Sequence, residues 1–159
     1  MKKIMIFSLL LMAFSATAQN KAINDFYLKY KDKGCFTLDL SGNFLSGFLK
    51  SGDQDDELKQ LANHIDQFKM VNIPKEVQIF SIAAINDLKK SIKKDKFEDV
   101  FTIKDKESDI SVLVKEVKGD VKEIIMLANG TDGVFMLNIF GNIPRDKVEK
   151  LMENIEINR

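Results

Sequence analysis

Two residues of this chain have side chains suited to nucleophilic catalysis, Cys35 and His64, and each is the only one of its type. A catalytic thiol or hydroxyl needs a base within hydrogen-bond reach, most often a histidine. His64 follows Leu61 by three residues and precedes Ile65, at the edge of an apolar helical stripe, where a half-exposed structural histidine is expected. Cys35 lies on the side of a predicted strand opposite the apolar residues of that strand. A buried or half-buried structural thiol is expected there rather than an activated thiolate. We therefore assign no catalytic residue.

Two motifs of known sites are incomplete in the segment that follows. A serine-hydrolase elbow has the pattern Gly-x-Ser-x-Gly, and the segment around Ser46 lacks its first glycine. Gly42 and Gly47 have the separation of a phosphate-binding loop. However, Phe48 and Leu49 replace the Lys and Ser/Thr that would hold the terminal phosphates and magnesium. The sequence predicts no cofactor-binding residues.

An acidic run, Asp53, Asp55 and Glu57, superficially resembles the start of a calcium-binding loop. Leu58 occupies the position that requires glycine, and His64 occupies that of the bidentate glutamate. Acidic residues at a helix start are stabilised by free backbone amides and the helix dipole, which explains the run without a metal. A looser surface calcium site stays open as an alternative. Zinc and haem are disfavoured, because one histidine and one cysteine cannot complete a tetrahedral shell. We predict no metal ligand.

A lysine-rich segment and an Asn-Gly dipeptide also have simple structural interpretations. The lysines fall opposite the apolar residues of a predicted helix, as expected for a solvated face: Lys89, Lys90, Lys93, Lys94 and Lys96. The sequence Asn129-Gly130-Thr131 matches a glycosylation acceptor, but it also favours a tight hairpin turn. We interpret the first as a helix surface and the second as a turn.

The first 18 residues have the layout of a cleavable secretory signal peptide. Lys2 and Lys3 precede an apolar run from Ile4 to Phe14, which is shorter than the roughly 20 residues needed to span a bilayer. The sequence Ala16-Thr17-Ala18 then supplies the small residues that a signal peptidase requires. We predict cleavage near Ala18, a periplasmic or secreted location, and no membrane span in the mature chain. An uncleaved membrane anchor is the alternative.

Size and charge point to one ordinary domain over residues 19–159. The chain has 24 Lys and Arg against 24 Asp and Glu, so loss of Lys2 and Lys3 leaves a small acidic excess. Near-neutrality argues against a nucleic-acid partner. A chain of this length buries enough surface for a core without covalent cross-links, and Cys35 has no second cysteine with which to form an internal disulfide.

Apolar periodicity predicts the elements of this domain. In the first half we expect a helix after Asn20 that ends near Gly34, a strand over 35–40, a short helix over 43–50, an amphipathic helix from Leu58 as far as Ile65 or Phe68, a brief strand over 69–73 that Pro74 ends, and a helix over 82–94. In the second half we expect strands over 97–103, 110–117, 121–128 and 134–140. A terminal helix opening at Pro144 follows, with Val148, Leu151, Met152 and Ile155 on its buried face. The fold class is α+β: a mostly antiparallel sheet with a C-terminal meander, and amphipathic helices packed on one face.

Three stretches together resemble a known family. They are the signal peptide, the segment from Gly34 to Gly52, and the closing pattern Gly133-Val-Phe-Met-Leu-Asn-Ile-Phe-Gly-Asn-Ile-Pro followed by a helix. They are similar to an exported bacterial family catalogued as domain of unknown function 4252. The resemblance covers most of the mature chain and implies an exported α+β architecture. It brings no catalytic residues, because the shared patterns are apolar and turn sequences.

These observations favour a non-catalytic binding, sensing or interaction module of the cell envelope, whose partner is another envelope protein or a small ligand. Two alternatives remain at this point. One is a small hydrolase or isomerase that uses carboxylates and lysines, which are too numerous here for sequence to select a pair. The other is a structural or assembly partner in the envelope.

Overall fold

The computed structural model describes residues 20–52 and 56–150. The predicted signal peptide (1–18), Asp53 and Asp55, and the last three positions of the predicted terminal helix (Leu151, Met152 and Ile155) lie outside the described residues. The strands are β1 (Phe36–Ser41), β2 (Ile65–Pro74), β3 (Glu98–Lys104), β4 (Asp109–Val117), β5 (Asp120–Gly130) and β6 (Gly133–Pro144). The helices are α2 (Lys21–Tyr30), α3 (Gly42–Ser51), α4 (Asp56–Ala62) and α5 (Gln78–Lys94), with a 3-10 turn at Lys75–Val77 (η2).

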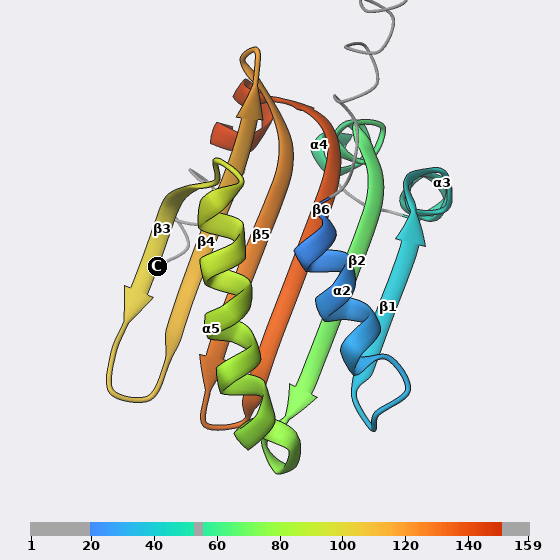
Figure 1. Cartoon of the computed structure of the whole chain (residues 1–159). Coiled ribbons are helices and arrows are strands. Elements are labelled where there is room, and N and C mark those ends of the chain that lie inside the picture. Colours follow the sequence, from blue (N-terminus) through green and yellow to red (C-terminus); the bar gives the residue numbers. More distant parts are fainter. Residues whose placement is uncertain (1–19, 53–55, 151–159) are drawn as a thin grey trace, which may run out of the picture.

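All six strands form one antiparallel sheet in the order β1-β2-β6-β5-β4-β3 (Figure 1). After β2 the chain crosses one face of the sheet as α5 and reaches the far edge. It then returns as the meander β3-β4-β5-β6, which places β6 beside β2 in the middle. The α+β class, the antiparallel sheet and the C-terminal meander that the sequence predicted are therefore confirmed.

Two tight hairpins connect the last three strands of the meander. The turn between β4 and β5 has Lys118 at φ +57° and Gly119 at φ +89°, the geometry of a type I′ turn. The turn between β5 and β6 consists of Thr131 and Asp132, because Gly130 pairs with Gly133. Asn129 and Gly130 thus belong to the end of β5, one step before the turn itself.

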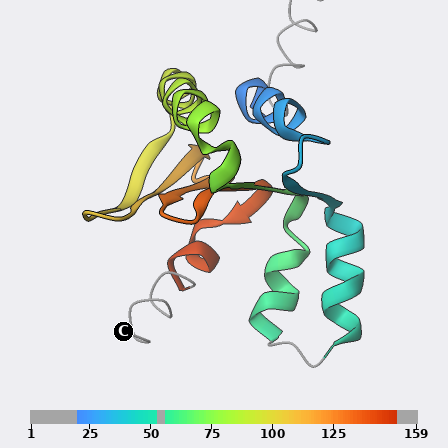
Figure 2. The same ribbon diagram turned by 90° about the horizontal axis from the view of Figure 1, so that it is seen from below.

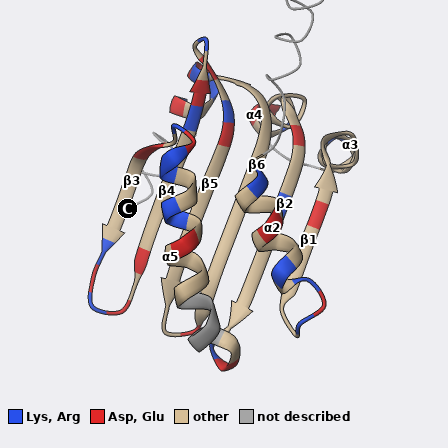
Figure 3. Ribbon diagram, in the orientation of Figure 1, with Lys and Arg blue, Asp and Glu red and all other residues tan. Residues whose placement is uncertain are grey.

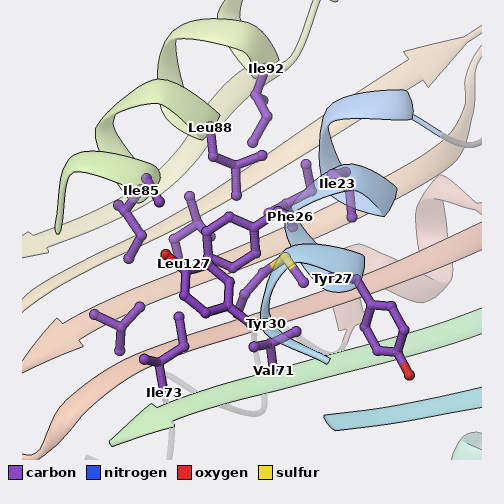
Figure 4. Packing of buried hydrophobic residues seen from close by; sticks show 14 of the residues in the cluster. Ile23, Phe26, Tyr27, Tyr30, Val71, Ile73, Ile85, Leu88, Ile92 and Leu127 are labelled. Carbon is purple, nitrogen blue, oxygen red and sulfur yellow. The ribbon is translucent and has the colours of Figure 1, made fainter. Parts of the chain in front are cut away.

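The main apolar cluster lies between the sheet and the two helices α2 and α5 (Figure 4). Helix α2 begins at the predicted cap Asn20, whose side chain accepts hydrogen bonds from two backbone amides. The predicted inward residues of α2 and α5 are buried together with residues of β2, β4, β5 and β6: Ile23, Phe26, Tyr27, Tyr30, Ile85, Leu88, Ile92, Val71, Ile73, Leu113, Ile125, Leu127, Val134 and Met136. Each such side chain contributes roughly 1.5–3 kcal/mol by leaving water.

The expectation that all helices cover one face is corrected by α3 and α4, which lie on the opposite face (Figure 2). Leu45 of α3, Leu61 of α4 and Val148 of the helical residues 145–150 pack on a second, smaller cluster on that face. Its buried members come from β2, β4, β5 and β6: Ile65, Val114, Val121 and Ile143. The reason is geometric: α3 directly follows β1 and α4 directly precedes β2, and the apolar residues of these two helices meet the side of the sheet that α2 and α5 leave open.

The helix predicted from Leu58 to Ile65 or Phe68 is too long. Helix α4 ends at Ala62, and both Ile65 and Phe68 belong to β2, which begins earlier than predicted. Helical and strand spacing overlap in this segment, and pairing of β2 between β1 and β6 decides the outcome. Pro144 likewise is the last residue of β6 rather than the first residue of a helix.

A prediction concerns the glycine at the junction of β1 and α3. A Cβ at Gly42 would meet the backbone carbonyl oxygen of Ile65 at 1.6 Å, whereas a Cβ at Gly47, in the same helix, would meet open space. We expect Gly42→Ala to lower the free energy of unfolding by about 3 kcal/mol, because backbone must move. Gly47→Ala should raise it by roughly 0.5–1 kcal/mol through helix propensity. Urea unfolding of the two variants tests this, and equal effects would contradict the close approach.

Candidate functional site

Cys35 and His64 lie at opposite ends of the sheet and form no dyad. Cys35 precedes Phe36, which pairs with Asn72, and His64 is eight residues along the chain from Asn72. At about 3.3 Å per strand residue the separation is roughly 26 Å. Burial raises the pKa of the Cys35 thiol above its ordinary value, although nearby Lys33 partly opposes this, so the thiolate is disfavoured. Both side chains are half-buried, as expected for structural residues.

The other residues weighed from the sequence also have structural surroundings. Gly42 opens α3 against the Ile65 carbonyl, and Ser46 donates a hydrogen bond to the side chain of Asn63. Glu57 lies in the first turn of α4, a helix of seven residues. Within the ranges 20–52 and 56–150, no group of three or more His, Cys, Asp and Glu side chains is placed to hold a metal ion.

The lysines of α5 are mostly exposed, as predicted for a solvated face, and Figure 3 shows them intermixed with acidic residues of neighbouring elements. Lys89 differs from the rest. It is half-buried and donates to the carboxylate of Asp109 at 3.2 Å and to the hydroxyl of Ser111 at 3.4 Å, both on β4. A surface hollow of about 280 Å³ lies beside this pair, between α5 and strands β3 and β4.

A buried polar cluster that sequence reasoning missed lies under α2, with Glu123 of β5 at its centre. Glu123 is 1% exposed, and Asn138 of β6 donates to its carboxylate at 2.9 Å. The backbone amide of Asn20, the N-cap of α2, donates to the same carboxyl group. The Asn20 side chain in turn donates to Asp95, at the end of α5, at 2.6 Å. One carboxyl group and one helix cap thus connect β5, β6, α2 and α5.

Lys69 of β2 extends this polar region toward β1. Its ammonium donates to the side chain of Asn24 at 2.9 Å, lies 3.8 Å from the Asp39 carboxylate and stands 5.4 Å from the centre of the Tyr27 ring. Asn24 and Tyr27 both belong to α2. The side chain of Lys69 is 4% exposed, so these contacts replace water around a buried charge. Lys69 therefore fixes α2 to the sheet by polar contacts.

The sequence does contain a signal for this cluster. Glu123 alternates with Ile125 and Leu127, which belong to the main apolar cluster, so it occupies a position of β5 whose following neighbours on the same face are apolar. A charged residue at a buried position of a strand indicates a buried polar partner, because burying an unpaired charge is costly. The partner itself, Asn138, interrupts the apolar run of β6 in the same way.

Glu123 and Lys69 are covered rather than accessible. Two surface hollows of the described part of the chain lie elsewhere: the one beside Lys89, and one of about 430 Å³ around the β5–β6 turn. Neither includes Glu123 or Lys69 among its lining residues. The polar contacts of this cluster connect α2 and α5 to the central strands, so its role is structural.

Helix α3 presents the most exposed large apolar side chains described in this protein. Phe48 is 66% exposed and Phe44 is 61% exposed, one helical turn apart. Phe36, on the edge strand β1 that leads into α3, is 59% exposed. Figure 2 shows α3 and α4 projecting from the sheet. This edge of the molecule therefore offers aromatic surface to solvent on a rigid support.

Comparison with known proteins identifies the family. The family described as "Domain of unknown function (DUF4252)" matches residues 27–151. The chain belongs to this family. The match includes all six strands, helix α3, and both Glu123 and Asn138, and it confirms the resemblance seen in the sequence. No curated protein and no solved structure matches the chain.

In this DUF4252 protein, no helix of the described ranges is both long and apolar enough to cross a membrane.

The polar cluster gives a pH prediction for this family member. Burial raises the pKa of Glu123 above its ordinary value of 4.5, and the hydrogen bonds from Asn138 and Asn20 oppose the shift only in part. The folded state therefore favours the protonated carboxyl more than the unfolded state does. The stabilisation that follows is complete below about pH 4.5 and is lost as the pH rises through the folded-state pKa.

Urea unfolding of the wild type and Glu123→Gln between pH 3.5 and 8 measures this contribution as the difference between the two curves. We expect the free energy of the wild type to fall relative to that of Glu123→Gln as the pH rises. Glu107→Gln, at an exposed carboxyl on the β3–β4 connection, is the control and should follow the wild type. A Glu123→Gln curve parallel to the wild type would contradict the shift.

Proposed function

We propose that this protein is an exported, non-catalytic interaction module of the cell envelope, which docks a partner protein through α3. The observation that carries the proposal is the outward pair Phe44 and Phe48, exposed by 61% and 66% on a helix that projects from the sheet. Exposed apolar patches mark interaction sites, and aromatic side chains contribute strongly to the buried centres of protein interfaces.

The sequence of α3 supports an interface role for these two rings. Phe44 and Phe48 are four residues apart and lie on the same side of the helix. Leu45 uses another side to pack on the second cluster, so the core holds α3 in place without covering the phenylalanines. The rings are thus presented in a fixed orientation, which lowers the entropy cost of docking.

The charge of α3 favours a protein partner over a lipid surface. A helix that lies on an anionic membrane has several basic residues on its polar side, whereas Lys50 is the only charged residue of α3. The balanced charge of the whole chain argues against a nucleic acid. An apolar groove or pocket on another protein, wide enough for two aromatic rings one helical turn apart, is the surface that fits.

Export is supported by the N-terminal sequence, with Lys2 and Lys3, the apolar run and the Ala16-Thr17-Ala18 site. We expect the protein isolated from its natural host to begin at Gln19. Intact-mass measurement of protein from envelope and cytosolic fractions tests this. A chain that keeps residues 1–18, in either fraction, would contradict cleavage near Ala18.

The docking proposal predicts the effect of a double substitution on α3. Phe44→Ser with Phe48→Ser should abolish capture of the partner from envelope extracts, because the apolar contact is lost. Unfolding free energy should change little, since both rings are already in water. Leu28→Ser is the matched control: Leu28 is 56% exposed on α2, on the other face, and its replacement should leave capture intact.

Three results would refute this function. One is a protein captured equally by the wild type and the α3 double variant. Another is flotation of the wild type, but not of the double variant, with vesicles of phosphatidylethanolamine and phosphatidylglycerol, which would assign the two rings to a membrane. The last is a loss of capture with Leu28→Ser equal to that with the double variant.

A further inference from the structure

The surface hollow of about 280 Å³ between α5 and strands β3 and β4 is unusually polar for this side of the sheet. Strand β3 is the edge of the sheet and lies beside α5 (Figure 1). On the side of the strands that faces α5, Thr102 is paired with Ser111 and Lys104 with Asp109. Among the described residues that line the hollow, Leu113 alone belongs to the main apolar cluster, and the other side chains are charged or carry a hydroxyl.

Lys89 is held in a fixed position at the wall of this hollow. Its ammonium donates to Asp109 at 3.2 Å and to Ser111 at 3.4 Å, and the side chains of Lys89 and Asp109 are only 25% and 32% exposed. An ammonium group has three N–H donors, and these two bonds use two of them. A lysine already fixed in this way loses less conformational entropy on binding a ligand than a mobile surface lysine does.

Two further lysines line the same hollow and give it an excess of positive charge. Lys93 follows Lys89 by one helical turn on the same side of α5, and Lys104 lies on β3 directly opposite Asp109. The carboxylate of Asp109 therefore has a lysine on either side, which neutralises its charge. The other acidic residue of the lining, Asp99, is paired with Leu113, four residues along β4 from Asp109 and roughly 13 Å away. Three lysines against two aspartates leave the lining with a net charge of plus one.

We propose that this hollow binds a small organic anion through its oxyanion group, a carboxylate or a phosphate. The three lysines supply charge-assisted hydrogen bonds, and the hydroxyls of Thr102 and Ser111 supply further donors. A cationic ligand fits less well, because it would compete with Lys89 for the Asp109 carboxylate. The volume lies just below the roughly 300–1,000 Å³ of pockets that hold drug-sized ligands, so the anion is small. The hollow is on the face opposite α3, and this assignment does not depend on the proposed function.

Nuclear magnetic resonance titration of the protein with inorganic phosphate and, separately, with acetate tests the site. Each ion replaces chloride at neutral pH and constant ionic strength, so that general screening of charge stays the same. We expect saturable shifts of the backbone amide signals of Thr102 and Ser111 with at least one of the two ions. The ion with the lower dissociation constant shows whether the natural ligand presents a phosphate or a carboxylate.

Matched variants separate this site from a general attraction between anions and lysines. Lys93→Gln with Lys104→Gln should raise the dissociation constant about fivefold or more without affecting the fold, since both side chains are exposed. Lys90→Gln with Lys94→Gln removes the same charge from exposed positions of α5 that do not line the hollow, and it should bind as the wild type does. Ser111→Ala removes a hydroxyl without changing the charge and should also weaken binding.

Four results would overturn the assignment. One is the absence of a saturable shift with both phosphate and acetate. Another is an equal rise of the dissociation constant in the two lysine double variants, which would mean that the anions respond only to overall charge. The third is unchanged binding by Ser111→Ala. The last is a saturable response to methylammonium with none to either anion, which would make Asp99 and Asp109 the binding groups.

Discussion

The packing of α2 and α5 on one face of the six-stranded sheet is the contact on which the rest of this structure depends. It buries the larger apolar cluster, including Ile23, Ile73 and Met136, each at 0% exposure. The chain has a single cysteine and therefore no internal disulfide to support this contact. Because the sheet is held on this face, its edge strand β1 and the projecting helix α3 have a rigid base.

Polar contacts add orientation to that packing. Glu123, Asn138 and Asn20 connect two central strands to the start of α2, while Asp95 connects that start to the end of α5. Lys69 connects β2 to the middle of α2 through its contacts with Asn24 and Tyr27. Apolar packing alone permits helices to slide along a sheet, whereas hydrogen bonds at fixed positions specify one register. These polar groups therefore hold α2 and α5 in position on the sheet, whereas the phenylalanines of α3 are exposed to solvent.

Sequence periodicity predicted much of this arrangement for physical reasons that can be named. The meander was predictable because its strands are apolar runs of strand length and because Gly119 and Gly133 lie in or next to the connections between them. The boundary between α4 and β2 was not, because Ile65 and Phe68 satisfy helical spacing as well as strand pairing. The exposure of Phe36, Phe44 and Phe48 was also not predictable, since their spacing is that of residues that normally pack inward. Only the arrangement of neighbours shows that nothing described covers them.

The amino-acid sequence by itself determined the class of the fold, the meander, the inward residues of α2 and α5, and the absence of a complete catalytic motif, because these follow from residue types and short-range spacing. The tertiary structure alone decided which face each helix covers, that Cys35 and His64 lie at opposite ends of the sheet, and that Glu123 meets the cap of α2. Such contacts join residues as far apart as Asn20 and Glu123 along the chain. The order of the strands brings them together, and local spacing contains no information about that order.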